Sequence, residues 1–136
     1  MTKRLKHPTP GIDWETRAYW EGCGRHELIL QRCRSCRALQ QRPRALCVSC
    51  LSDDIEHFPA SGRGTLYSFT VTHQNQAPGF REATPYVLAY VELEEGVRLL
   101  TNIVGCATDE VRIGMPVMVD YADLDENIAV PRFRPL

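Results

Sequence analysis

The 136-residue sequence contains no apolar run near the roughly 20 residues that a membrane-spanning helix requires. Its basic start, residues 1–8, is not followed by an apolar segment, so we expect no signal peptide and no membrane partner. Of its six cysteines, four are spaced as metal ligands and two are left over. This usage favours the reducing cytoplasm over an oxidising compartment.

Common catalytic patterns are also missing. We find no Ser-His-Asp order, no paired-carboxylate site and no nucleotide loop. The glycines Gly62 and Gly64 do not form a phosphate loop, because the residues after them alternate as a strand and no helix follows. They instead predict a bulge or a sharp bend within residues 61–64. The sequence therefore predicts a chain that is not catalytic alone.

The most informative stretch holds Cys33, Cys36, Cys47 and Cys50, two Cys-x-x-Cys pairs separated by ten residues. Two such pairs can place four thiolates at the corners of a tetrahedron around Zn²⁺, at about 2.3 Å from the ion. A site with four protein ligands is closed, so we expect a structural zinc. Iron in the same four thiolates, or a thioredoxin-like redox pair, are the alternatives. Extended runs before the pairs, at 28–31 and 44–46, predict a zinc ribbon of two hairpins.

Charge is divided unevenly along the chain. Residues 24–50 carry six arginines and one acid, for a net charge of +5, whereas residues 51–136 carry a net charge of −7. Guanidinium groups suit phosphates and carboxylates. The arginines of the ribbon therefore either bind an anionic ligand or cover a solvated surface.

An N-terminal helix is expected over residues 13–22, with Asp13 as its cap and Gly22 at its end. Thr16 stands where a capping box has Glu or Gln, so we expect no reciprocal cap. The aromatic residues Trp14, Tyr19 and Trp20 offer too much apolar surface to remain exposed. They either pack against the ribbon and barrel or dock on a partner.

After residue 59 the pattern is mainly β. Alternation predicts five strands, and a helical turn at 108–113 falls between the third and fourth of them. That order is typical of an OB-fold, a five-stranded Greek-key barrel, and a six-stranded sandwich is the alternative. The expected division is an N-terminal arm and helix at 1–26, a zinc ribbon at 27–58 and an OB-fold at 59–136. The expected strands cover residues 65–73, 85–93, 97–104, 116–121 and 128–133.

Several short motifs, in order, resemble an acyl-CoA-associated family that joins a rubredoxin-like zinc ribbon to an OB-fold, known as domain of unknown function family 35. The resemblance covers nearly the whole chain, and Cys23 departs from it. The matching stretches are YWEG at 19–22, LQRCRSC at 30–36, GRGTLYS at 62–68, PGF at 78–80, PYV at 85–87, Gly105, IGMPV at 113–117 and PRFRP at 131–135.

The resemblance implies a non-catalytic subunit that stabilises a thiolase-like or side-chain aldolase partner acting on acyl-CoA thioesters by thiolysis or retro-aldol cleavage. The implied assembly is a hetero-oligomer of two plus two subunits. Acyl-CoA would then be a ligand of the complex, because ribbon arginines can meet the CoA phosphates and a barrel loop can contact the ligand. The candidate CoA or partner contacts are Arg32, Arg34, Arg37, Arg42, Arg44, Phe80 and Arg81.

Two other functions remain open from the sequence. Zinc ribbons and OB-folds also bind single-stranded nucleic acid, although the charge of −7 on residues 51–136 disfavours a backbone track. The second of these functions is an enzyme that uses Cys106 as a reactive thiol, because a helical turn near this residue can lower the pKa of the thiol.

Overall fold

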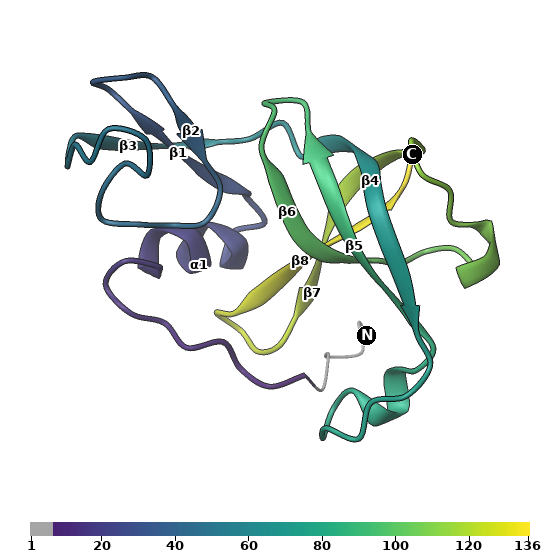
Figure 1. Cartoon of the computed structure of the whole chain (residues 1–136). Helices are drawn as coiled ribbons and strands as arrows, with labels where there is room; N and C mark the ends of the chain where they lie inside the picture. The colour runs from purple at the N-terminus through teal and green to yellow at the C-terminus, as the bar shows by residue number, and fades with distance from the viewer. Residues whose placement is uncertain (1–6) are drawn as a thin grey trace.

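The computed structural model of the chain describes residues 7–136 and places a three-stranded sheet beside a closed five-stranded barrel (Figure 1). The single α-helix lies beneath the sheet, next to the hairpin of the last two strands. No helix among these residues is long and apolar enough to cross a bilayer. The elements are α1 (Arg17–Gly24), β1 (Ile29–Cys33), β2 (Leu39–Gln40), β3 (Ile55–Pro59), β4 (Arg63–Thr72), η1 (Arg81–Ala83), β5 (Tyr86–Leu93), β6 (Arg98–Ile103), η2 (Thr108–Glu110), β7 (Pro116–Asp123) and β8 (Ala129–Pro135).

The start of α1 differs from the sequence prediction. A turn occupies residues 14–16, and the α-helix begins at Arg17. Asp13 Oδ1 accepts the backbone N–H of Thr16 at 2.9 Å, as expected of a cap, while Thr16 Oγ1 accepts the N–H of Asp13 at 3.1 Å. These reciprocal bonds close the turn before the helix, whereas the N-cap residue of α1 is Thr16 and makes no side-chain capping bond.

The small sheet has the order β2-β1-β3, with both neighbours antiparallel to β1. The expected strand at 44–46 is wrong. This stretch is irregular, because its backbone bonds to side chains: Ala45 N–H donates to Glu15 Oε2 at 2.8 Å, and Arg44 bonds to Gln31. The long partner of β1 is instead β3, in a register that runs from Ile29↔Pro59 to Cys33↔Ile55.

The five-strand barrel closes in the order β4-β5-β6-β8-β7. Only β6 and β8 run parallel, joined at Ile103↔Phe133, and the 3₁₀ turn η2 lies between β6 and β7. This is the connectivity of an OB-fold, so the expected barrel is confirmed over the sandwich. The expected hairpin turn at 94–96 is present, with Gly96 N–H bonded to the Leu93 carbonyl at 2.8 Å.

The bulge in β4 lies three residues beyond Gly64, the second of the glycines where the sequence predicted it. Pairing with β5 shifts register between Leu66 and Ser68, which leaves Tyr67 as the extra residue. Strict alternation would put Leu66 and Phe69 on opposite faces. The bulge puts both toward the core, because it reverses the alternation within the strand.

At Gly64 the backbones of β4 and β5 are close, since a Cβ there would lie 2.5 Å from the Glu92 carbonyl oxygen.

One cluster of buried side chains joins the helix, the small sheet and the barrel. It includes Tyr19 and Cys23 of α1, Leu30 of β1, and Leu66 and Phe133 of the barrel. The core therefore holds the metal-bearing sheet against the barrel, with the arginine-rich segment after β2 facing β5 and β6.

Candidate metal centre and arginine groove

The four predicted ligands come together. The Sγ atoms of Cys33, Cys36, Cys47 and Cys50 lie within 4.8 Å of one another, with Cys33–Cys50 at 3.6 Å and Cys36–Cys47 at 3.5 Å. A tetrahedral Zn²⁺ with bonds of about 2.3 Å separates its sulfurs by about 3.8 Å. The cluster therefore has the size of a four-thiolate zinc site, and no place remains for a substrate on the ion.

Two similar turns build the site. Arg37 N–H donates to the Cys33 carbonyl at 2.8 Å, and Leu51 N–H donates to the Cys47 carbonyl at 2.9 Å. Both residues have left-handed backbones, with φ of 67° for Arg37 and 64° for Leu51. Side chains disfavour this conformation, so the turns depend on the hydrogen bonds and on the metal to hold them.

Backbone amides also prepare two sulfurs as thiolates. Cys36 N–H points at Cys33 Sγ at 3.5 Å, and this amide lowers the pKa of Cys33 to about 6. The amides of Cys50 and Ser49 lower the pKa of Cys47. A thiolate is the form that binds metal, so these bonds prepare two of the four ligands. The pKa values of Cys36 and Cys50 are raised, because the neighbouring sulfurs outweigh the amide bonds that these two thiols receive.

The two thiols outside the metal cluster, Cys23 and Cys106, have raised pKa values. Cys23 is fully buried, and burial raises its pKa to about 12. Burial and the charge of Glu110 raise the pKa of Cys106. The helical turn near Cys106 is a 3₁₀ turn at Thr108–Glu110, and the raised pKa does not favour Cys106 as a nucleophile.

A pair of glutamines holds the segment between the two metal turns. Gln31 and Gln40 are 3% and 7% exposed, and Gln40 Nε2 donates to Gln31 Oε1 at 2.7 Å. Gln31 bonds to both backbone groups of Arg44, and Gln40 Oε1 accepts the N–H of Val48 at 3.0 Å. This clamp was not predictable from local patterns, because both residues have the polarity expected of surface positions.

The structure separates the ribbon arginines into two groups. Arg32 and Arg34 form ion pairs with Glu56 at 3.2 Å each, and Arg34 also pairs with Asp54 at 3.3 Å. Their charges are therefore partly neutralised by β3 and the residue before it. Arg37 lies in the first metal turn and is exposed.

Arg42 and Arg44 lie elsewhere, in a hollow of about 410 Å³ between the ribbon and the barrel. Neither takes part in an ion pair within residues 7–136. The opposite wall belongs to the barrel and includes Arg98, Tyr90 and Leu100. We call this hollow the arginine groove.

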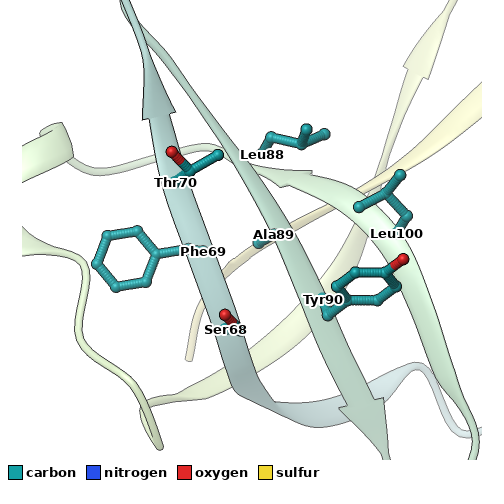
Figure 2. A pocket seen from close by; sticks show the side chains of 7 residues that line it. All are labelled: Ser68, Phe69, Thr70, Leu88, Ala89, Tyr90 and Leu100. Carbon is teal, nitrogen blue, oxygen red and sulfur yellow. The ribbon is translucent and has the colours of Figure 1, made fainter.

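Arg98 was missed in the sequence, although its position opposite Glu92 in the hairpin marks it as a cross-strand partner. Its Nε donates to Glu92 Oε2 at 2.8 Å, and its guanidinium lies 3.8 Å from the centre of the Tyr67 ring. Figure 2 shows Tyr90 and Leu100 side by side on β5 and β6. Both side chains line the arginine groove. Exposure of 48% and 55% makes these two side chains a solvent-facing apolar wall.

The other predicted contacts lie away from the arginine groove. Phe80 stacks on the His7 ring, with centroids 4.3 Å apart, and Arg81 donates to the Gln76 carbonyl at 3.1 Å. Trp14 is 72% exposed. Tyr19 is 7% exposed and belongs to the core, so its side chain is not a docking surface. Trp20 is half-buried against the same core.

Two family profiles match the chain in order. The profile described as the ChsH2 rubredoxin-like zinc ribbon domain matches residues 20–56, and that of the ChsH2 C-terminal OB-fold domain matches residues 58–122. The metal cluster falls within the first match, and the second covers β4 to β6 and nearly all of β7, while β8 lies beyond it. The four cysteines are therefore those of a zinc ribbon.

Curated relatives cover the same region. A probable enoyl-CoA hydratase alpha subunit of Thermomonospora curvata is 41% identical over 128 residues, 94% of this chain, which spans only 40% of that protein. A DUF35 domain-containing scaffold protein of Methanocaldococcus jannaschii is 36% identical over 76% of this chain and 73% of its own length. The benzoylsuccinyl-CoA thiolase subunit BbsA of Thauera aromatica is 33% identical over 68% of this chain and 65% of its own.

A solved structure agrees with these relatives. A chain in the structure of the Ltp2-ChsH2(DUF35) aldolase superimposes with a TM-score of 0.83 at 40% identity, covering 93% of this chain and 98% of that one. Homologues of this chain are thus subunits of thiolase and aldolase complexes. On the combined grounds of fold, four-cysteine cluster and near-complete overlap, the chain belongs to the DUF35 family of zinc-ribbon and OB-fold proteins.

Proposed function

We propose that this chain is the non-catalytic subunit of a thiolase-like or aldolase complex that cleaves a carbon–carbon bond of an acyl-CoA thioester by thiolysis or retro-aldol reaction. The single observation that carries the proposal is the arginine groove. It combines two unpaired cations, Arg42 and Arg44, with the apolar wall of Tyr90 and Leu100. Both features suit a ligand that is anionic and aromatic in different parts.

The CoA tail has that chemistry. Its phosphates accept hydrogen bonds from guanidinium groups, and its adenine stacks on exposed aromatic rings. In the proposed arrangement the phosphates meet Arg42 and Arg44, while Tyr90 lies under the base. Arg32 and Arg34 contribute less, because Glu56 and Asp54 already occupy them. The thioester end extends toward the partner, which supplies the reacting groups.

The zinc has a structural role in this proposal. All four coordination positions belong to cysteines, so the ion cannot polarise a thioester. Its task is to fix the two turns between which Arg42 and Arg44 lie. The exposed Trp14 is the proposed anchor for the catalytic subunit, in a complex of two plus two chains.

The test uses the complex assembled with its catalytic subunit. We expect Arg42→Ala combined with Arg44→Ala to weaken acyl-CoA binding by about a hundredfold or more, since each charge-assisted hydrogen bond contributes about 1.5 kcal/mol or more. The matched control, Arg25→Ala combined with Arg63→Ala, removes two exposed arginines that do not line the arginine groove. Equal affinity of both double variants for the CoA ester would overturn the proposal.

A second measurement addresses the division of labour. We expect the chain alone to show no turnover of acyl-CoA, whereas its addition to the catalytic subunit restores activity. Trp14→Ala is expected to weaken co-purification of the two subunits while leaving the zinc content unchanged. Turnover by the isolated chain would contradict its non-catalytic role.

A further inference from the structure

A second hollow, of about 300 Å³, lies on the barrel away from the metal centre. The N-terminal arm at residues 7–10 forms one side of it, α1 another, and strands β5, β6 and β8 the floor. We call it the arm pocket. Leu100 lies between the arm pocket and the arginine groove, since it lines both. A volume of this size is at the lower end for small-molecule sites, which span about 300–1,000 Å³.

Two residues that line the arm pocket each carry a buried polar atom without a partner. Arg132 Nε and His7 Nε2 are buried and make no hydrogen bond within residues 7–136. Arg132 also takes part in none of the ion pairs of these residues, although Asp120 is its neighbour across the β7–β8 ladder. An unpaired buried N–H group is costly, and the Arg132 guanidinium, which has no ion-pair partner within residues 7–136, is suited to an anionic ligand.

The charged side chain that lines the arm pocket is positive, that of Arg132. Its lining includes no Asp or Glu side chain. Burial and the positive charge of Arg132 lower the pKa of His7. The neutral imidazole is therefore favoured, and its Nε2 can either donate or accept a hydrogen bond. Arg132 keeps its charge even where burial lowers its pKa, because the guanidinium starts from a very high value. The arm pocket is thus complementary to a single negative charge.

Aromatic and apolar side chains form the rest of the lining. Trp20 and Phe80 are the largest of them, with Leu88 and Leu100 beside them. Phe80 is held between the His7 ring at 4.3 Å and the Tyr86 ring at 6.2 Å, centroid to centroid. A ligand that fits this surface needs an apolar body as well as a charge. A free phosphate lacks that body and carries more charge than one guanidinium can satisfy.

We propose that the arm pocket binds a small amphipathic carboxylate, with its ring or acyl body between Trp20 and Phe80 and its carboxylate on the guanidinium of Arg132. This site is separate from the proposed CoA contacts and does not depend on them. It gives a role to Phe80, which the arginine groove leaves unused.

The two tryptophans make the test direct, because Trp20 lines the arm pocket and Trp14 does not. The ¹⁵N-labelled, zinc-loaded full chain is titrated with naphthalene-2-carboxylate, and the two indole N–H signals are followed by NMR after assignment with Trp14→Phe. We expect saturable shifts of the Trp20 signal and none of the Trp14 signal. Naphthalene-2-carboxamide has the same aromatic body without the charge. We expect its affinity to be lower than that of the carboxylate by about tenfold or more.

Variants then identify the contacts. Arg132→Gln is expected to lower naphthoate affinity about tenfold or more, whereas Arg134→Gln, an exposed arginine on the same strand, leaves it unchanged. Phe80→Ala tests the apolar half without touching the barrel core, and its affinity loss is expected for both naphthalene compounds. Absence of a Trp20 shift, equal binding of acid and amide, or equal effects of Arg132→Gln and Arg134→Gln would each overturn the proposal.

Discussion

The side-chain amide of Gln31 brackets the backbone of Arg44. Its Nε2 donates to the Arg44 carbonyl at 3.0 Å, and its Oε1 accepts the Arg44 N–H at 3.0 Å. A residue on β1 thereby makes the bonds that a neighbouring strand would make, and the segment carrying Arg42 and Arg44 stays irregular but fixed. The position of the arginine groove depends on this amide.

Replacing the amide tests its contribution. In Gln31→Leu both backbone groups of Arg44 lose their partner inside the protein, at about 1–3 kcal/mol for each unsatisfied group. We expect the free energy of unfolding to fall by about 2–4 kcal/mol, measured by urea denaturation of the zinc-loaded chain. Gln74→Leu makes the same chemical change at an exposed loop position and is expected to have little effect. Similar losses in both variants would show that the bracket contributes nothing.

Removing the metal is expected to affect one region only. With the ion gone, Arg37 and Leu51 keep left-handed backbones with little to hold them, and like charges gather in the cluster. Amide hydrogen exchange at residues 33–52 is therefore expected to accelerate by orders of magnitude on chelation, while β4 to β8 retain protection.

Metal analysis provides the matching controls. We expect one zinc per chain in the native protein, less in Cys47→Ser, and an unchanged content in Cys106→Ser, since Cys106 lies outside the cluster. Unchanged exchange at residues 33–52 after complete chelation would contradict a role for zinc in holding the turns.

A substitution at Gly64 tests how closely the backbone of β4 packs against its neighbouring strands. A Cβ at this position would lie 2.5 Å from the Glu92 carbonyl oxygen and 2.9 Å from Val91 Cγ1, where β4 is paired with β5 on one side and β7 on the other. We expect Gly64→Ala to lower the free energy of unfolding by about 1–3 kcal/mol, as typical of overpacking. Gly11→Ala, with no atom within 4 Å of the new Cβ, is the control and is expected to be nearly neutral. A neutral Gly64→Ala would show that the strands can separate without cost.

Stability is expected to fall in alkaline solution. Burial raises the pKa of Cys23 from 9.0 to about 12, so the folded chain keeps a proton that the unfolded chain has lost. This contribution is complete below pH 9 and is lost as pH rises toward 12, at up to about 1.4 kcal/mol per pH unit. Urea midpoints measured between pH 8 and about pH 10.5 should decline less steeply in Cys23→Ala than in the native chain. Parallel declines would mean that Cys23 titrates alike in both states.

Features set by local pattern were predictable from the sequence. The spacing of Cys33 to Cys50 identified the ligands, because adjacent turns determine where their sulfurs meet. Alternation identified the five barrel strands, and Gly96 identified the hairpin turn. These signals depend on neighbours in the chain, so no knowledge of tertiary contacts was needed.

Features set by distant contacts were not predictable. The pairing of β1 with β3 joins segments more than 20 residues apart, and the bulge at Tyr67 depends on how β4 meets β5. Tyr19 and Gln31 were misjudged or missed for a related reason: an aromatic ring near a helix end and an amide in a strand look the same in sequence whether buried or exposed. The arm pocket combines elements from both ends of the chain, so local patterns do not reveal Arg132.

The shared interior of helix, ribbon and barrel has a consequence for assembly. Because Leu30 of β1 and Phe133 of β8 belong to one packed cluster, a rotation of the ribbon relative to the barrel would have to break buried contacts. Another protein that touches both halves meets a shape already set before contact, and little freedom is lost when they associate. Such rigidity is what a scaffold needs in order to hold a second polypeptide in a single orientation.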